Sequence, residues 1–446
     1  MSVKLWQKSK DSLESVTRFT SGRDAEMDIY LAPFDVLGSL AHITMLESVG
    51  LLKKDELKIL AAELKNIYQE IQDGKFKIEQ GVEDVHSQIE LLLTQRLGEV
   101  GKKIHSGRSR NDQVLVDIKL FLRSEIQSLT EDIKSLFDLL IAKSEAHKDK
   151  LLPGYTHFQM AMPSSFGLWF GAYAESLVDD LIVLQSAYRV VNTNPLGSAA
   201  GYGSSFPLNR KMTTELLGFD DLNYNVVYAQ MGRGKTERIV AQALGNVAAT
   251  VGKMAMDLVL YLNPNFAFIS FPEELTTGSS IMPHKKNPDV LEIIRARCNQ
   301  LQSLANEVTI STTNLPSGYH RDMQVLKEII FPAFQSLKDC LQMSVLMLNN
   351  VQVKENLLAD EKYQYLFSVE EVNKLVLQGV PFRDAYKQVG KLIEEGKFKA
   401  DTKLKHTHVG SIGNLNNLDI KRNFENELSD FGFERITQSI QKLIVS

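Results

Sequence analysis

The middle of this 446-residue chain is dominated by long stretches in which apolar residues recur every three or four positions. The clearest stretch comprises Leu115, Ile118, Leu122, Ile126, Leu129, Ile133, Leu136 and Leu140. This spacing places the apolar side chains along one face of a single long α-helix. Similar stripes occupy residues 168–184, 239–261, 291–308 and 326–348. Helices of about 20 to 30 residues span roughly 30 to 45 Å, so each needs neighbours along its whole length.

The five stripes predict a mainly α fold built around a long helical bundle. Shorter helical patterns, such as 36–51 and 56–71, precede the stripes, and a capping-box-like Ser368-Val-Glu-Glu and a break at Val380-Pro381-Phe382 follow them. We see no convincing strands except possible short ones near the C-terminus. We expect an N-terminal helical domain (1–107), a central bundle for oligomerisation and the active site (108–355) and a small C-terminal domain (356–446). Several stripes are too wide in apolar residues for five helices to bury, which favours an oligomer.

Composition excludes several classes of protein. The chain is 43% hydrophobic and 24% charged, as ordinary globular proteins are, and its net charge of -5 argues against a general nucleic-acid binder. Cys298 and Cys340 both lie in apolar helical patterns, so a disulfide framework or a cysteine metal site is not expected. The N-terminus lacks a signal-peptide core, and no run approaches a membrane span. We therefore expect a cytoplasmic protein that does not contact a membrane.

The most chemically dense segment is Gly278-Ser-Ser-Ile-Met-Pro-His-Lys-Lys-Asn-Pro-Asp289. A glycine followed by two serines makes a mobile backbone with exposed N–H groups, and Lys285 and Lys286 add positive charge, so the segment suits an anion. Asn287 and Pro288 are interpreted as the cap and first residue of a helix, whose end adds partial positive charge. Taken by composition alone, such a loop is more often an ordinary surface loop before a capped helix.

Three further polar strings lie at predicted helix junctions. They are Ser106-Gly-Arg-Ser-Arg-Asn-Asp-Gln113, Gly154-Tyr-Thr-His-Phe-Gln159 and Tyr319-His-Arg-Asp-Met-Gln-Val-Leu-Lys327. The first could grip a carboxylate through two arginines, although an exposed helix cap explains it almost as well. The second opens the second long helix and contains His157, which titrates near neutrality but is more often structural beside aromatic residues. The third opens the fifth long helix.

Together the strings resemble the argininosuccinate lyase branch of the fumarase/aspartase superfamily over nearly the full length. The superfamily signature Gly-Ser-Ser-x-Met-Pro-x-Lys-x-Asn-Pro is met by residues 278–288, and the branch is indicated by Lys286, Asp289, the first two polar strings and residues 31–42. The resemblance implies a homotetramer with a shared central bundle and active sites assembled from three subunits. It implies anti elimination of argininosuccinate to arginine and fumarate, in arginine biosynthesis, by a carbon–nitrogen lyase without a metal or organic cofactor.

The resemblance also carries residue roles. It implies Ser279 as general base, Lys285 and Asn287 as stabilisers of the aci-carboxylate, and Thr156 and His157 at the leaving nitrogen, with Glu292 holding His157. The serine would need activation by Lys285, by loop N–H groups and by exclusion of water. The implied substrate-binding residues are Asp28, His86, Ser109, Arg110, Asn111, Asn287, Tyr319, Gln324 and Lys327.

Some positions depart from the family pattern. Family members usually have serine at Asp24, two acidic residues at Val325 and Leu326, and a different string at residues 230–235, and the final forty residues also match poorly. These departures concern the contacts to arginine more than the elimination itself. Two alternatives stay open: a sister lyase acting on adenylosuccinate, for which we find no additional basic string, and a catalytically silent structural tetramer like the lens crystallins.

Overall fold

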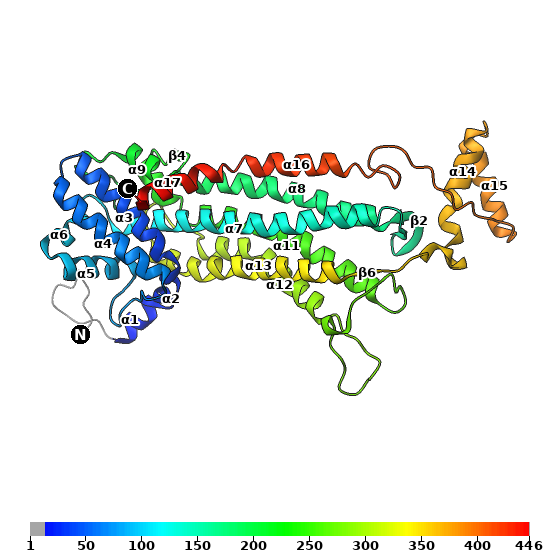
Figure 1. The fold of residues 1–446 in the computed structure, drawn as a ribbon, viewed down its shortest axis with the longest axis horizontal. Coiled ribbons are helices and arrows are strands. Elements are labelled where there is room, and N and C mark those ends of the chain that lie inside the picture. Colours follow the sequence, from blue (N-terminus) through cyan, green and yellow to red (C-terminus); the bar gives the residue numbers. More distant parts are fainter. Residues whose placement is uncertain (1–13, 446) are drawn as a thin grey trace.

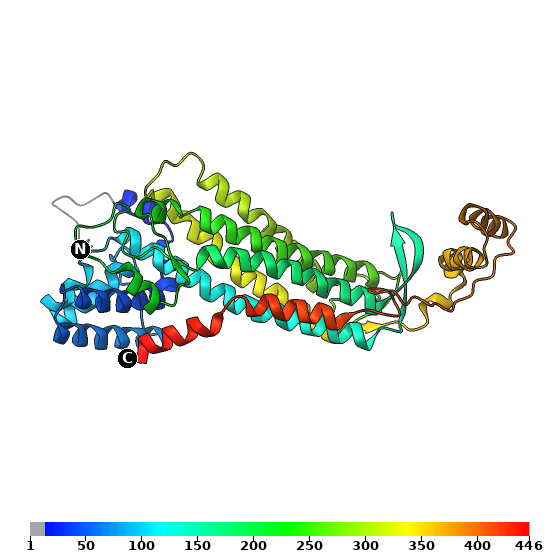
Figure 2. The ribbon, with the colours of Figure 1, turned by 90° about the horizontal axis from the view of Figure 1, so that it is seen from above.

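Each of the five apolar stripes forms one long helix in the computed structural model, which describes residues 14–445. The helices are α7 (Arg110–Ala146), α8 (Phe166–Val191), α11 (Lys235–Leu262), α12 (Asp289–Ser311) and α13 (Leu326–Asn350). They lie side by side along the molecule (Figures 1 and 2), with α11 against α12 and α7 against α8. The predicted mainly α bundle is therefore confirmed.

Local sequence explains where α7 begins and which face it buries. Ser109 Oγ accepts a hydrogen bond from the N–H of Asn111 (3.3 Å), and Asp112 accepts one from the N–H of Ser109 (2.8 Å), so the first turn is capped from both sides. Further along, the stripe residues Ile126 and Ile133 are fully buried. Periodicity and cap together specify a helix of 37 residues without a break.

Short elements form a head at the N-terminal end of the bundle (Figure 1). The helices of the head are α1 (Glu14–Ser21), α2 (Asp24–Asp28), α3 (Ala32–Ser48), α4 (Lys54–Gln72), α5 (Val85–Leu97), α6 (Glu99–Lys102), α9 (Arg210–Leu216) and α10 (Val226–Met231), with 3-10 turns η1 (Ile29–Leu31) and η2 (Lys103–His105). Strand β3 (Thr193–Asn194) pairs in parallel with β4 (Asp221–Leu222). A further 3-10 turn, η4 (Arg321–Val325), leads into α13.

The opposite end of the bundle carries an antiparallel hairpin of β1 (Leu151–Thr156) and β2 (Gln159–Ser165). Near it lie η3 (Glu273–Leu275), the antiparallel pair β5 (Ile269–Ser270) and β6 (Gln352–Val353), η5 (Leu357–Ala359), η6 (Glu361–Phe367), α14 (Ser368–Leu377) and α15 (Phe382–Glu394). Helix α16 (Asn417–Ser429) then runs back along α8, and α17 (Phe433–Val445) reaches α3 in the head (Figure 1). The division at 107 and 355 stays a prediction, but only the middle of 356–446 lies beyond the bundle.

Three local predictions were wrong. Residues 154–159 belong to the hairpin and do not open α8, which begins at Phe166 after Ser165 caps its first turn. Asn287 does not cap α12, because its side chain instead reaches back to Gly278 O (3.3 Å). Ser368 lies inside α14 and makes no capping hydrogen bond.

Two apolar stretches also correct the statement that no run approaches a membrane span. The stretch from Phe19 to Ser48 and helix α11 are long and apolar enough to cross a membrane, by length and composition. Both pack inside the fold, with 72% and 50% of their most apolar windows buried. Core helices of globular proteins meet the same criterion, so these stretches are weak evidence for a membrane. Cys298 and Cys340 are free thiols and both are buried.

The close approach of α8 to the end of α7 depends on Gly167. A Cβ atom there would lie 2.6 Å from Lys148 Cα and 2.9 Å from Ser144 O, both of which are backbone atoms. Gly167→Ala should therefore lower the free energy of unfolding by about 1–3 kcal/mol, measured by denaturant titration. The matched control is Gly390→Ala, because a Cβ at Gly390 in α15 meets nothing within 4 Å. Equal stability of the two variants would contradict this packing.

Candidate active site

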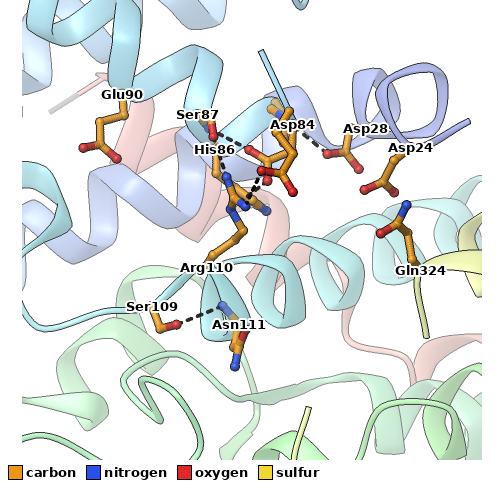
Figure 3. A network of polar contacts seen from close by, with 12 residues as sticks. Asp24, Asp28, Asp84, His86, Ser87, Glu90, Ser109, Arg110, Asn111 and Gln324 are labelled. Carbon is orange, nitrogen blue, oxygen red and sulfur yellow. Dashed lines mark hydrogen bonds and ion pairs between the residues drawn. The ribbon is translucent and has the colours of Figure 1, made fainter. Parts of the chain in front are cut away.

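A charged pocket of about 210 Å³ lies in the head where α2, the start of α5, the start of α7 and η4 meet. It brings together most of the residues predicted to bind substrate: Asp28, His86, Arg110, Asn111, Tyr319, Gln324 and Lys327. Ser109 lies beside it as the cap of α7 (Figure 3). The N-terminal ends of α5 and α7 both meet the pocket, and helix N-termini favour negatively charged groups of a ligand.

Arg110 is held by acidic residues that precede α5. Its Nε lies 2.8 Å from Asp84 Oδ2 and its Nη1 lies 3.2 Å from Glu83 Oε2, while Nη2 donates to Ser87 Oγ (2.7 Å) (Figure 3). Glu83 also binds Arg321 Nη2 at 2.7 Å. The side chain of Arg110 keeps 35% of its surface exposed. The guanidinium is thus oriented in advance and is still open to a ligand.

Lys327 is the buried counterpart of Arg110. Only 4% of its side chain is exposed, and its ammonium pairs with both Asp24 and Asp28. Burial lowers the pKa of Lys327, but the two carboxylates outweigh burial and raise it, so the ammonium stays charged. Burial raises the pKa of Asp24 to about 6, although Lys327 opposes the shift. Asp28 also accepts a hydrogen bond from the N–H of Val85 (3.2 Å), which ties α2 to α5.

Residues in or next to the segments that depart from the family pattern hold η4, which lines this pocket. Arg233, inside the departing string 230–235, pairs with Glu237 at 2.7 Å and donates from Nη2 to Met323 O (2.8 Å). Gln324 Nε2 donates to Thr20 O and Ser21 O, at 3.0 and 2.9 Å, and so connects η4 to the end of α1. Leu326 is buried in the core and supplies no charge. Asp24 from α2 supplies an acid beside Lys327.

The hairpin presents Thr156 and His157 at its tip. Thr156 pairs with Gln159, so His157 and Phe158 form a two-residue turn, and both have positive φ, 54° and 56°. This turn type matches the twist of the strands, but such φ values are uncommon for residues other than glycine. Thr156 and His157 are exposed, and Phe158 is 78% exposed. A strained turn with exposed polar groups is a candidate contact site.

The segment 278–286 forms an exposed loop whose base is closed like a hairpin. Thr277 and Asn287 exchange two backbone hydrogen bonds of 3.1 and 2.8 Å. Within the loop, Ser279 Oγ accepts from the N–H groups of Met282 (3.2 Å) and Ile281 (3.4 Å). Donors aimed at an oxygen favour negative charge on it. Lys285 is exposed in this loop, and Glu292 is exposed in the first turn of α12.

The head pocket, the hairpin and the 278–286 loop are far apart within one chain (Figure 1). The 37 residues of α7 separate Arg110 from the hairpin, and a helix of that length spans about 55 Å. The 23 residues of α12 separate the loop from the segment that begins at Tyr319. Among residues 14–445, Glu292 and His157 form no hydrogen bond or ion pair with each other. The predicted catalytic residues therefore do not meet the binding residues of the head pocket in this single chain, although Asn287 lies at the base of the 278–286 loop.

Several pocket residues were missed by sequence reasoning. Asp24, Glu83, Asp84, Val114 and Arg321 also line the pocket. Glu83 and Asp84 lie in the same string as His86, and Arg321 lies in the same string as Tyr319. The sequence could therefore have indicated these three residues through their neighbours. Asp24 was noticed only as a departure from a family pattern. Its pairing with Lys327 depends on residues about three hundred positions apart, which no local pattern reveals.

Lys327→Met should destabilise the head strongly, because it leaves the buried carboxylate of Asp28 without a cation. Breaking a buried ion pair typically costs about 3–5 kcal/mol, so we expect a clear fall in the thermal unfolding midpoint. Lys374→Met is the matched control, because Lys374 also pairs with two acids, Glu371 and Asp401, but at an exposed position. The control should unfold like the wild type. Equal midpoints for both variants would contradict the buried network.

Comparison with known proteins agrees with this arrangement. The family described as Lyase matches residues 14–303. An argininosuccinate lyase from Parabacteroides distasonis is 62% identical over 444 residues and covers 100% of both chains. One from Thermotoga neapolitana is 36% identical and covers 87% of this chain and 98% of its own.

Solved structures show the same fold at lower identity. An EDDS lyase in complex with formate has a TM-score of 0.74 at 21% identity, covering 97% of this chain and 94% of its own. A fumarate lyase:delta crystallin from Brucella melitensis has a TM-score of 0.70 at 16% identity, covering 92% and 95%. The family match and the full-length similarity to these relatives establish that the chain belongs to the argininosuccinate lyase family of the fumarase/aspartase superfamily.

Proposed function

We propose that this protein is an argininosuccinate lyase, which eliminates arginine from argininosuccinate and leaves fumarate. The observation that carries the proposal is the convergence of the predicted binding residues on one pocket with both fixed cations and carboxylates. Lys327 and Arg110 suit the carboxylates of the substrate, and Asp24, Asp28, Glu83 and Asp84 suit its positively charged arginine part. Full-length similarity to argininosuccinate lyases supports the same assignment.

The chemistry of the proposed reaction is a proton abstraction followed by loss of nitrogen. Ser279 removes a proton from the carbon next to a carboxylate, and the electron pair moves into an aci-carboxylate. Lys285 and Asn287 stabilise that charge. The electron pair then returns to form the carbon–carbon double bond of fumarate as the carbon–nitrogen bond breaks, and the nitrogen leaves with the electrons of that bond and takes a proton near Thr156 and His157. The N–H groups aimed at Ser279 Oγ support its role, because they favour the charged form of the oxygen.

We further propose that the active form is a homotetramer in which the head pocket, hairpin and loop of each site come from different subunits. The separation of these parts by α7 and α12 supports the sharing of sites. Apolar side chains are also left exposed on the bundle, namely Ile182, Val183, Met256, Ile293, Ile310, Met343 and Leu346. Burying them between copies stabilises an oligomer through the hydrophobic effect. We also propose a cytoplasmic location with no nucleic-acid or membrane partner.

The charges of the pocket do not favour adenylosuccinate as the substrate. The pocket cations Arg110, Arg321 and Lys327 are each paired with acids of the lining, and the pocket provides no additional basic cluster for a phosphate among the described residues. The test is to supply purified protein with argininosuccinate and, separately, with adenylosuccinate. We expect fumarate and arginine in equal amounts from the first and no fumarate from the second. Fumarate from adenylosuccinate, or no product from either substrate, would contradict the proposal.

Ser279→Ala should lower turnover by at least about a thousandfold, the scale expected when a positioned proton-transfer group is lost. The loop is exposed and Ser279 holds only local hydrogen bonds, so the fold should not change. Steady-state rates of fumarate release measure the effect, with circular dichroism and molecular mass as controls for folding and assembly. Turnover close to that of the wild type would remove Ser279 from the role of base.

Mixed subunits test whether sites are shared. Refolding Ser279→Ala subunits together with His157→Asn subunits should restore part of the activity, because some sites then combine an intact loop with an intact hairpin. Ser279→Ala mixed with Lys285→Met is the matched control. Both changes fall on one loop, so every site keeps a defect and no activity should return. Recovery in the control, or none in the test pair, would oppose shared sites.

A further inference from the structure

Behind the pocket, three buried side chains form a cluster whose acidic members have no assigned role. His86 Nδ1 lies 2.5 Å from Asp35 Oδ2 and 3.5 Å from Asp117 Oδ2. The exposed fractions of His86, Asp35 and Asp117 are 6%, 2% and 1%. The three residues come from α5, α3 and α7, so the cluster lies where the main elements of the head cross. Only His86 reaches the pocket.

The two carboxyl groups must share a proton. Carboxylate oxygens of Asp35 and Asp117 lie within 4.8 Å of each other, and two buried carboxylates this close do not both carry charge readily. Burial and then the charge of Asp35 raise the pKa of Asp117 well above its ordinary value. Asp117 Oδ2 also has no hydrogen-bond partner among the described residues, which costs a neutral acid much less than a carboxylate. Asp117 is therefore the protonated member.

The charge of Asp35 is balanced by His86. Burial alone raises the pKa of Asp35, but His86 and Arg108 outweigh it and the pKa is lowered. Burial lowers the pKa of His86, whereas Asp35 and then more distant acids raise it overall. The charged or titratable groups that face His86 from the elements around it are Asp28, Asp35, Asp84, His105, Arg108, Arg110 and Asp117. His86 is thus an imidazolium paired with one carboxylate.

A second buried histidine in the head shows what happens without such a partner. His42 is fully buried and its Nε2 lies 2.8 Å from Ser106 O, but no acid contacts it among the described residues. Burial, then the charge of Arg108, lowers the pKa of His42 to about 3. The two histidines have similar burial and opposite protonation. The difference follows from the position of Asp35.

The imidazole ring of His86 has one nitrogen committed to the cluster. Because Nδ1 is bound to Asp35, the Nε2 edge is left for a ligand in the pocket. We propose that Asp35, supported by a protonated Asp117, is a positioning residue that holds His86 as a fixed positive donor whose Nε2–H binds a carboxylate of the substrate. This inference rests on the proposed function, since argininosuccinate supplies the carboxylate. The aspartates act through His86 and do not touch the substrate.

A metal ion is the competing occupant of this cluster, since the three side chains could each offer one ligand atom. The geometry favours a proton. Ligand atoms that share a metal each lie about 2.0–2.2 Å from it and so stay about 3 Å or more apart. The 2.5 Å separation of His86 Nδ1 and Asp35 Oδ2 is too short for two ligands of one metal and places the two atoms in direct hydrogen-bond contact.

The test is the pH dependence of KM for argininosuccinate in Asp35→Asn. In the wild type His86 stays charged, so KM should change less than about threefold between about pH 6 and pH 8. In Asp35→Asn the pKa of His86 falls to or below its ordinary value of about 6.5, so His86 is neutral at pH 8 and KM at that pH should be about tenfold or more above that of the wild type. The effect on kcat should be much smaller, because the contact binds the substrate and does not move the proton.

Three further variants separate this role from a structural one. Asp117→Asn keeps a neutral donor beside Asp35, so its KM profile should keep the flat shape of the wild type. His86→Asn should raise KM at every pH, and adding Asp35→Asn to it should introduce no pH dependence. His42→Gln, the matched buried histidine, should alter the thermal midpoint and leave the shape of the KM profile alone.

A KM at pH 8 in Asp35→Asn close to that of the wild type would overturn the inference, as would a KM in Asp117→Asn raised as much as that of Asp35→Asn. Stoichiometric metal in the purified protein, with a KM that rises when a chelator is added, would also overturn it. These results differ from failure of the proposed function, in which the wild type itself releases no fumarate. If Asp35→Asn folds poorly, the titration of His86 followed by NMR in wild-type protein, assigned with His86→Asn, decides the charge state. A group that titrates below about pH 7 would then contradict the inference.

Discussion

The rigidity of α7 is the constraint on which the rest of the structure depends. One unbroken helix of 37 residues holds the charged pocket at its start and the hairpin just beyond its end. Helices α8 and α13 pack against it and α11 and α12 complete the bundle, so the chain cannot fold back on itself to bring these parts together (Figure 2). A helical bundle makes a stiff rod, so the parts at its two ends stay apart within one chain.

The cations in and behind the head pocket are each paired with acidic side chains. Lys327 with Asp24 and Asp28, Arg110 with Glu83 and Asp84, and His86 with Asp35 each place a cation against acid. Paired charges in a site of low dielectric stay charged and keep their orientation, whereas His42, which has no acidic partner, becomes neutral. The pocket can therefore present fixed cations to a dianionic ligand without a large cost of reorganisation on binding.

Sequence periodicity predicted the five long helices because burial of one face dominates their energetics, and those helices were confirmed. The hairpin at 151–165 was missed because its turn uses His157 and Phe158 at positive φ, where the usual signal is Asn-Gly. The cap assigned to Asn287 was wrong because its side chain closes the loop instead. The roles of Asp35 and Asp117 could not be predicted, because they depend on a contact between α3, α5 and α7 that no local sequence pattern shows. The roles of the predicted site residues stay predictions.

We propose that one chain carries all the parts of a site but no complete site. The decisive measurement is the rate of fumarate release per subunit as the protein is diluted, with the molecular mass of the particles followed in the same samples. We expect activity to disappear in step with the tetramer, and separated subunits that are still helical by circular dichroism to release no fumarate. Monomers that retain the specific activity of the assembled protein would contradict it.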